Sequence, residues 1–219
     1  MRYECLVLAT NIDHHNEGLG SSFPVKPYDY SKNDPSYFDA LGHPSDVSRL
    51  DRFLRDWKMS RVLAKLQPGW KSQLAEILSK RQSLIAPLRG NDILTANLTA
   101  LKTDVVKLFE EITGVVRPTA AAKIIHVQAP DLCPLWDLQI RGGYGCASNA
   151  EGYHNFLRRT KEELEQVVKT YADSSPGLTD PLNDFMARIA SPFPGISATR
   201  ILDHYNYQKY TRRSLPPSC

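Results

Sequence analysis

From Ser45 onward, apolar side chains recur at steps of three and four residues, the spacing that places them on one face of a helix. Almost no segment alternates apolar and polar residues, as a half-buried strand would. The expected helices cover residues 45–66, 70–85, 92–112, 119–129, 151–172, 180–190 and 197–206, and the third is long enough to be two. The sequence therefore predicts an all-α fold.

The first 44 residues have a different texture. They are rich in Pro, Gly, Asn, Asp and Tyr, and only the stretch YECLVLAT has the composition of a strand. A chain of 219 residues suits one globular unit. We expect an irregular N-terminal arm, residues 1–44, packed on a helical domain, residues 45–219, with a helical hairpin at 105–129 and a basic C-terminal tail at 205–219.

Cysteine and histidine spacing gives no sign of a disulfide framework or a metal site. The four cysteines lie far apart without a C-x-x-C pair, and the adjacent His14 and His15 cannot share one helix face. The N-terminal apolar run reaches Asp13 too soon for a signal peptide, and no run is long enough to span a membrane. We expect reduced thiols, no metal or other cofactor, no obligate protein partner, no membrane contact and an intracellular location, cytoplasmic or, in a eukaryote, nuclear.

The net charge of +3 is unevenly distributed along the chain. Residues 47–103 carry eleven basic and four acidic side chains, and residues 205–219 carry three and none. Such clustering suits a surface that binds a polyanion, because each phosphate contact releases condensed counterions. A solvated helix face explains the middle segment equally well. The tail interleaves tyrosines with cations, which suits stacking and phosphate contact, or a frayed basic terminus.

The stretch ITGVVRPTAAAKIIHVQAPDLCPLWDLQIRGGYG, residues 112–145, is the most informative. Gly114 is expected as a left-handed C-cap, and Pro118 suits the first turn of the next helix, so two helices form a hairpin. The stretch resembles the helix-hairpin-helix DNA glycosylases, an 8-oxoguanine glycosylase-like fold whose hairpin L-P-G-V-G-x-K-T-A precedes a loop that ends in a catalytic aspartate. The matching residues are Gly114, Val115, Thr119 and Ala120 in the hairpin and P-L-W-D, residues 134–137, in the loop.

The chain departs from that pattern at two positions. Val116 stands where the second hairpin glycine belongs, and Pro118 stands where bifunctional members have their Schiff-base lysine. Lys123 follows five residues later, within a phrase, AAKIIHVQAPDL, that is similar to a divergent branch with K-x-L-H followed by P-x-L-F-P. The resemblance therefore implies the hairpin and the aspartate more strongly than lyase chemistry.

The resemblance implies a role for each site residue, and each has a plainer alternative. Asp137 would stabilise the cationic sugar and activate water, or would only N-cap the next segment. Lys123 is a second catalytic candidate, or a solvated lysine. Trp136, Tyr144 and His126 are candidates for the base pocket, or are core and helix residues. The candidates for DNA binding are Gly114, Arg117, Thr119, Ala120 and Arg141.

The expected function is a monofunctional DNA glycosylase that hydrolyses the bond to a damaged or modified base, in repair or in defence against phage DNA. Its partner would be double-stranded DNA with the target base flipped out. One alternative is a non-catalytic DNA-binding module, which Val116 favours because a side chain there crowds the approach of phosphate. The other is an N-glycosidase that acts on RNA or on a nucleoside.

Overall fold

The structure is a computed structural model that describes residues 1–18, 47–190 and 196–219. These residues form helices and no strand, which confirms the all-α prediction. The helices are α1 (Tyr3–Gly18), α3 (Val47–Asp56), α4 (Ser60–Leu63), α5 (Trp70–Lys80), α6 (Gln82–Arg89), α7 (Lys102–Thr113), α8 (Pro118–Gln128), α9 (Leu138–Gly143), α10 (Ala150–Asp173), α11 (Pro181–Ala190), α12 (Ala198–Asn206) and the π-helix η3 (Tyr207–Arg212).

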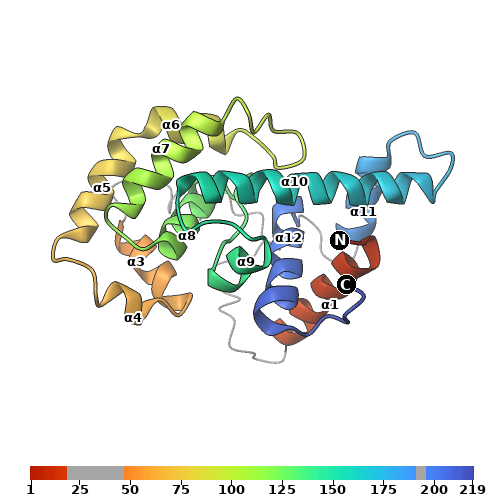
Figure 1. The fold of residues 1–219 in the computed structure, drawn as a ribbon, viewed down its shortest axis with the longest axis horizontal. Helices are drawn as coiled ribbons and strands as arrows, with labels where there is room; N and C mark the ends of the chain where they lie inside the picture. Colours follow the sequence, from red (N-terminus) through yellow and green to blue (C-terminus); the bar gives the residue numbers. More distant parts are fainter. Residues whose placement is uncertain (19–46, 191–195) are drawn as a thin grey trace.

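The long helix α10 crosses the middle of the molecule and joins its two halves (Figure 1). Helices α3 to α7 lie on one side, and α1, α11 and α12 lie on the other, with both chain termini close together. The short helix α9 lies between the halves. Helix α8 packs against α3, α6 and α7, and every residue from Ala120 to Gln128 is buried. Its three alanines leave room for the neighbouring helices to approach.

Aromatic side chains form the centre of the core beside α10. The Trp136 ring lies 5.6 Å from that of Phe109 on α7 and 5.3 Å from that of Tyr153 on α10. Phe109 and Tyr153 stack at 4.7 Å, and Phe156 completes the cluster. Large apolar surfaces and favourable ring geometry together make such a cluster a major source of stability. Because Trp136 is held in this cluster, the cluster also fixes the position of the next residue, Asp137.

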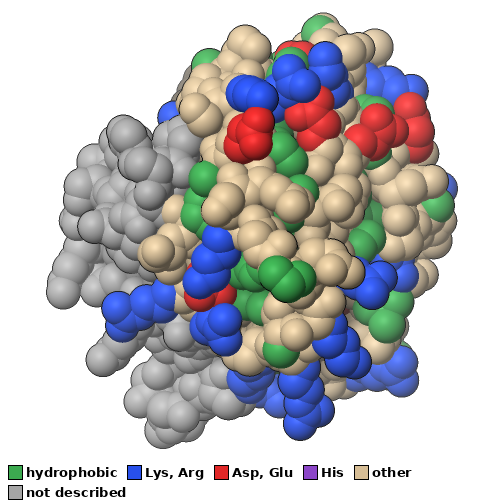
Figure 2. Space-filling view, turned by 90° about the vertical axis from the view of Figure 1, so that its left-hand side faces the viewer, with side chains coloured by type: hydrophobic (Ala, Val, Ile, Leu, Met, Phe, Trp, Pro, Cys, Tyr) green, Lys and Arg blue, Asp and Glu red, His purple; other side chains and the backbone are tan. Residues whose placement is uncertain are grey.

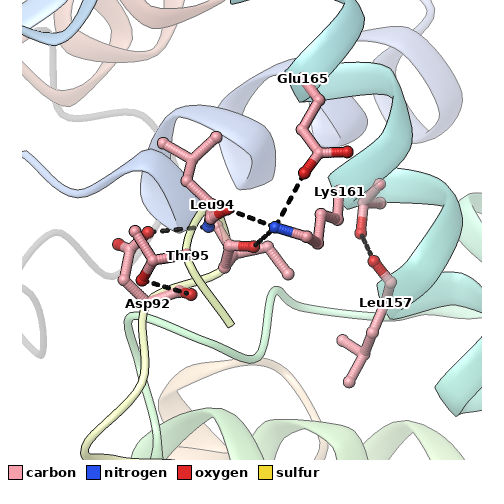
Figure 3. A network of polar contacts seen from close by, with 8 residues as sticks. Asp92, Leu94, Thr95, Leu157, Lys161 and Glu165 are labelled. Carbon is pink, nitrogen blue, oxygen red and sulfur yellow. Dashed lines mark hydrogen bonds and ion pairs between the residues drawn. The ribbon is translucent and has the colours of Figure 1, made fainter. Parts of the chain in front are cut away.

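The segment before α7 is a loop for which a helix was expected. Turns occupy most of residues 92–101, and α7 begins only at Lys102. Lys161 of α10 holds this loop, because its ammonium donates to the carbonyl oxygens of Ile93 and Leu94 and also pairs with Glu165 at 2.9 Å (Figure 3). A helix here would use those carbonyls internally. The tertiary contact to α10 therefore competes with the local helix preference of the segment.

Two expected long helices are each broken in the structure. The first divides into α3 and α4 at Lys58, whose φ of 59° lies in the left-handed region. The turn buries Met59 and Leu63, and no glycine or proline marks it in the sequence. The second divides into α5 and α6 at Arg81, and α6 continues past the expected end at residue 85 to Arg89, with Pro87 inside it. Expected helices 151–172, 180–190 and 197–206 are confirmed as α10, α11 and α12.

The expected strand near the N-terminus is wrong, because residues 3–18 form helix α1. Cys5, Leu6 and Ala9 are fully buried, and these positions share one face of a helix. Helix α1 packs on α12, so a distant part of the chain supplies the surface that this short apolar face needs. The rest of the expected arm, residues 19–44, lies outside the described residues.

The expectation of reduced thiols is also wrong for two of the four cysteines. Cys5 and Cys219 form a disulfide that joins α1 to the C-terminal end, across 214 residues of sequence. Cys133 and Cys146 are free. Disulfides are rare in cytosolic proteins, so this bond is unusual for the expected intracellular location. The pair could not be predicted from the spacing of the cysteines, because only tertiary packing brings the two residues together.

Candidate functional site

Asp137 lies at the N-terminus of α9, where it is half-buried. Its Oδ1 accepts hydrogen bonds from the backbone N–H groups of Gln139 and Ile140, both at 2.8 Å. Its Oδ2 accepts from the hydroxyl of Thr211 at 3.0 Å. The carboxylate is therefore fixed in orientation on both oxygens, by the helix on one side and by η3 on the other. The expected capping role is confirmed, and it leaves a catalytic role open.

Lys123 is buried in the middle of α8, with only 8% of its surface exposed, so the expectation of a solvated lysine is wrong. Its Nζ lies 4.6 Å from the centre of the Trp57 ring and donates to the Trp57 carbonyl oxygen at 3.4 Å. Burial lowers the pKa of Lys123 to about 8, and the negative charges of Asp137 and Asp203 partly offset this effect. The fold thus places a readily deprotonated amine within electrostatic reach of the Asp137 carboxylate.

Asp203 of α12 supports the loop that precedes Asp137. It is 3% exposed, and its Oδ1 accepts a hydrogen bond from the backbone N–H of Leu135 at 2.6 Å. Its other oxygen lies 4.0 Å from Nδ1 of His126. Burial lowers the pKa of His126 to about 3, so the imidazole is neutral and donates Nδ1–H to the Cys133 carbonyl oxygen at 2.7 Å. Asp203 thus holds the P-L-W-D loop against the protein interior, and His126 holds Cys133, the residue before that loop.

The hairpin between α7 and α8 is present, but the backbone conformation of Gly114 differs from the expected one. Gly114 has φ −63° and ψ −21°, so it is right-handed, and the expected left-handed cap is wrong. A Cβ there would lie 3.3 Å from the Glu111 carbonyl oxygen, so close approach of the backbone favours glycine. Val116 is buried, so its side chain does not crowd the exposed side of the turn. Arg117 is exposed and precedes α8, whose first turn has no side-chain cap.

Within α8, Thr119 is half-buried and Ala120 is fully buried, because the first turn of this helix packs against the protein interior. Their backbone N–H groups belong to the first turn, where an α-helix leaves its donors without internal partners. An exposed arginine beside such donors suits a phosphate group. The structure therefore keeps the expected phosphate-binding residues together at one corner.

The candidates for the base pocket lie in the interior. Trp136 is 1% exposed within the aromatic core, and His126 is fully buried. Tyr144 is 4% exposed, and its hydroxyl lies 2.9 Å from Asn206 Oδ1 and 3.1 Å from Glu163 Oε2, two acceptors that share its single proton. A base could touch these rings only after the core rearranged. The structure brings them together as packing residues around the site.

Tyr144 also borders a cavity of about 390 Å³. Neither Asp137 nor Lys123 lines this cavity, which is bounded by Gly143, Tyr144, Arg159, Glu162, Glu163, Gln166 and Tyr210. Arg141, a candidate for DNA binding, is half-buried; its guanidinium lies over the Trp136 ring at 5.7 Å and donates to the Ser148 hydroxyl. Its side chain thus packs on the same loop as the candidate site.

On the lower half of the face shown in Figure 2 the charged side chains are mostly Lys and Arg, whereas the upper half mixes Lys and Arg with most of the acidic residues. The basic half carries α3 and α4, and it is the half toward which α9 lies in Figure 1. We call the exposed cations of this region the basic face: Arg52, Arg55, Lys58, Arg61 and Lys65. Trp57, which contacts the Lys123 amine, lies between two of them in the α3–α4 turn, so the basic face borders the candidate site.

The C-terminal tail is ordered by contacts that exclude a frayed terminus. Lys209 donates to the Cys219 carbonyl oxygen at 2.9 Å and to the Tyr205 hydroxyl at 2.6 Å. Tyr205 is fully buried, and Tyr210 packs against Tyr144 with ring centres 5.4 Å apart. Most of the tyrosine surface is therefore used inside the protein, and the exposed cations of the tail are Arg212 and Arg213.

Sequence reasoning missed three residues of the site: Trp57, Asp203 and Thr211. Trp57 has the spacing of an ordinary apolar helix position, and Asp203 lies in a segment without a motif. Thr211 lies in the basic tail, but it is neither one of its cations nor one of its tyrosines. All three reach the site from more than 60 residues away in sequence, so no local pattern could have marked them. Among the described residues, no group of three or more His, Cys, Asp or Glu side chains is placed to hold a metal ion. None of the described helices has the length and apolar character to cross a membrane.

The chain was also compared with known proteins. No protein-family model, no curated protein and no solved structure matches it. The likeness of residues 112–145 to helix-hairpin-helix DNA glycosylases therefore stays a prediction, and the activity has to be inferred from the side chains themselves.

Proposed function

We propose that this protein is a DNA glycosylase that releases a damaged or modified base, with Asp137 as its catalytic carboxylate. The observation that carries the proposal is the Asp137 carboxylate, held on both oxygens beside a basic face and within electrostatic reach of the buried Lys123 amine. A carboxylate fixed on both oxygens suits a reaction that builds positive charge on a sugar. The neighbouring cations suit a polymer of phosphates.

In the proposed reaction, the bond between the sugar C1′ and the base nitrogen breaks, and its electron pair leaves with the base. The Asp137 carboxylate stabilises the cationic sugar and accepts a hydrogen bond from the water whose oxygen attacks C1′. The water loses a proton, and the departing base gains one. Oδ1 accepts two hydrogen bonds from the α9 backbone and Oδ2 accepts one from Thr211, so we assign this chemistry to the remaining lone pair of Oδ2.

A specific observation supports a second nucleophile, the Lys123 amine. An amine whose pKa is about 8 is partly neutral at physiological pH, and a neutral amine can attack C1′ in place of water. This attack displaces the base with its electron pair and leaves an aminal, in which C1′ carries the amine nitrogen and the ring oxygen. The ring oxygen then leaves C1′ and gains the proton that the nitrogen loses, which opens the sugar ring and forms an imine that borohydride reduces to a stable adduct. Excision with an adduct that disappears in Lys123→Met assigns the attack to the amine. Excision without any adduct assigns it to water.

Burial of Val116 removes the observation that favours a non-catalytic binding module. The module was favoured because a side chain at this position crowds a phosphate, but the valine packs inward and is 3% exposed. The exposed turn from Gly114 to Arg117 and the first turn of α8 are then accessible to a phosphate. We propose that this corner and the basic face bind the DNA backbone on either side of the extruded nucleotide.

The proposed activity is tested with duplexes that each carry one defined modified base: an oxidised purine, an alkylated purine or a bulky 5-substituted pyrimidine. Strand cleavage after heat and alkali, on at least one duplex, is the expected result. Unmodified duplex, RNA and free nucleosides are parallel substrates. DNA binding without cleavage of any duplex would instead indicate the binding module, and release from nucleosides alone would indicate a nucleoside N-glycosidase.

Neutralising the basic face should weaken DNA binding and make it less sensitive to salt. In Arg52→Gln combined with Arg61→Gln, the slope of log Kd against log salt should fall by about 2, because each lost phosphate contact removes about 0.9 of slope on duplex DNA. Fluorescence anisotropy at several salt concentrations measures this. The control is Lys107→Gln with Lys169→Gln, two exposed lysines of α7 and α10. Equal slopes for both double variants would exclude the basic face from binding.

Removing the arginine at the hairpin should weaken binding by the same factor on every sequence. Arg117→Ala deletes a cation beside the α8 N-terminus. At this position we expect contacts with the phosphate backbone of DNA and not with its bases. We expect a loss of about tenfold to a hundredfold, since a charge-assisted hydrogen bond contributes roughly 1.5–3 kcal/mol. Competition binding with duplexes of different sequence and base modification measures it. A loss confined to one modified base would contradict a phosphate contact.

A further inference from the structure

The C-terminal segment reaches the candidate site and is anchored at a distance from it. We call residues 207–219 the C-terminal strap. At its start, Thr211 donates a hydrogen bond to Asp137 Oδ2 at 3.0 Å. At its end, Cys219 is bonded covalently to Cys5 of α1. The strap therefore links the candidate catalytic carboxylate to a disulfide.

The strap is seated on both ends of α9. Thr211 meets the N-terminus through Asp137, and the Tyr210 ring lies against Gly143 near the C-terminus. A Cβ on Gly143 would come within 2.2 Å of that ring, so glycine is needed for the contact. Because two successive strap residues grip the two ends of α9, movement of the strap would disturb the cap on Asp137.

The far end of the strap is held by polar contacts that converge on the disulfide. The Cys219 carbonyl oxygen accepts hydrogen bonds from Tyr205 and Lys209, both at 2.9 Å, and the Ser218 carbonyl oxygen accepts one from Arg2 at 2.8 Å. Cys5 is fully buried on α1. These contacts are exposed or half-buried hydrogen bonds, which are individually weak. The covalent bond is the strongest constraint on this end of the strap.

We propose that Thr211 is a positioning residue for Asp137, and that the Cys5–Cys219 disulfide keeps it in place, so that reduction of the disulfide lowers the activity of the site. This rests on the proposed function. A small-molecule or protein dithiol is the reductant: the S–S bond breaks, both cysteines become thiols, and the dithiol becomes a disulfide. Without its tie, the strap exchanges between positions, and Asp137 Oδ2 loses the hydroxyl that fixes it. Small errors in placement of a catalytic group are costly.

Thr211→Val removes the hydroxyl and keeps the shape of the side chain. We expect kcat for base release to fall about tenfold with KM nearly unchanged, because a hydrogen bond to a charged group is lost at the reacting end. Thr211→Ser should recover most of the rate. Thr170→Val, an exposed threonine whose hydroxyl bonds only within α10, is the matched control. Full kcat in Thr211→Val would overturn the positioning role.

Reduction of the wild-type protein tests the disulfide without a mutation. With dithiothreitol, kcat should fall, and backbone hydrogen exchange of residues 207–213 should accelerate at least tenfold. Cys5→Ser should show both changes without the reductant and no further response to it. Unchanged exchange and kcat after complete reduction, verified by thiol counting, would overturn the role of the disulfide.

Hydrogen exchange also separates this proposal from the proposed function. If no protein releases a base from any duplex, the proposed function fails. The strap is then judged by the amides of Gln139 and Ile140, which Asp137 caps. Faster exchange of these amides in Thr211→Val and after reduction supports the link from strap to carboxylate, and exchange equal to that of Thr170→Val overturns it.

Discussion

Asp137→Asn should lower the rate of base release by about a hundredfold to a thousandfold, the range seen when one preorganised electrostatic group is removed from an active site. The amide has nearly the same shape as the carboxylate, but it has no charge to stabilise the cationic sugar. Asparagine is as good an N-cap as aspartate, so its Oδ1 still accepts from Gln139 and Ile140. Stability and DNA affinity should therefore change little. Single-turnover kinetics with excess enzyme measures the rate.

The matched control is Asp180→Asn, which alters a capping aspartate far from the site. Asp180 Oδ1 accepts from the backbone N–H of Asn183 at 3.0 Å, next to the start of α11. This variant should keep the full rate of base release. If the two variants release base equally well, Asp137 is a structural cap and takes no part in the chemistry.

Lys123→Met should make the protein more stable at neutral pH, although it removes a candidate catalytic group. The native pKa of Lys123 is about 8, below the ordinary value of 10.5. Between these values the unfolded chain binds a proton that the native protein does not, so stability rises with pH from 8 to 10.5 and is lowest below 8. At neutral pH the native protein bears the cost of burying the charged Lys123 amine, which lowers the free energy of unfolding by about 3 kcal/mol, since one pKa unit corresponds to 1.36 kcal/mol. Lys123→Met has no charge to bury and lacks this cost.

Urea unfolding of both proteins at pH 7, 8, 9 and 10 measures the effect as a difference. The advantage of Lys123→Met should be greatest at pH 7 and should shrink toward pH 10. The comparison cancels other groups, such as Cys133, whose burial raises its pKa to about 12 and lowers stability at high pH. Lys107→Met, at an exposed lysine, is the control. A constant difference at every pH would show that the Lys123 amine is protonated normally in the native protein.

The elements that could be predicted are those whose signal is local and strong. The helix that became α10 has apolar residues at helical spacing over more than 20 positions, and Pro118 marks the first turn of α8. Residues 92–101 and the break at Lys58 could not be predicted. In the first case carbonyl groups are used by Lys161, and in the second a left-handed lysine is held by the burial of its neighbour Met59. Neither cause is visible within a short window of sequence.

Asp137 could be identified because its neighbours in sequence are informative, and its capping geometry follows from a carboxylate placed before a helix. The burial of Lys123 could not be identified. A lysine among alanines is ordinarily solvated, and only the approach of the α3–α4 turn covers this one and places Trp57 over its amine. The lowered pKa is a property of that packing and not of the residue.

The sequence by itself determined the helical class, most helices of the second half and the position of the aspartate, because helical periodicity and capping act over a few residues. Only the tertiary structure decided the Cys5–Cys219 bond, the helix in place of an N-terminal strand and the contact between Thr211 and Asp137. These depend on residues 74 to 214 positions apart, or on a helix face that is buried only when α12 covers it. Burial and contact between distant segments, which set the charge of Lys123 and the orientation of Asp137, exist only once the chain has folded.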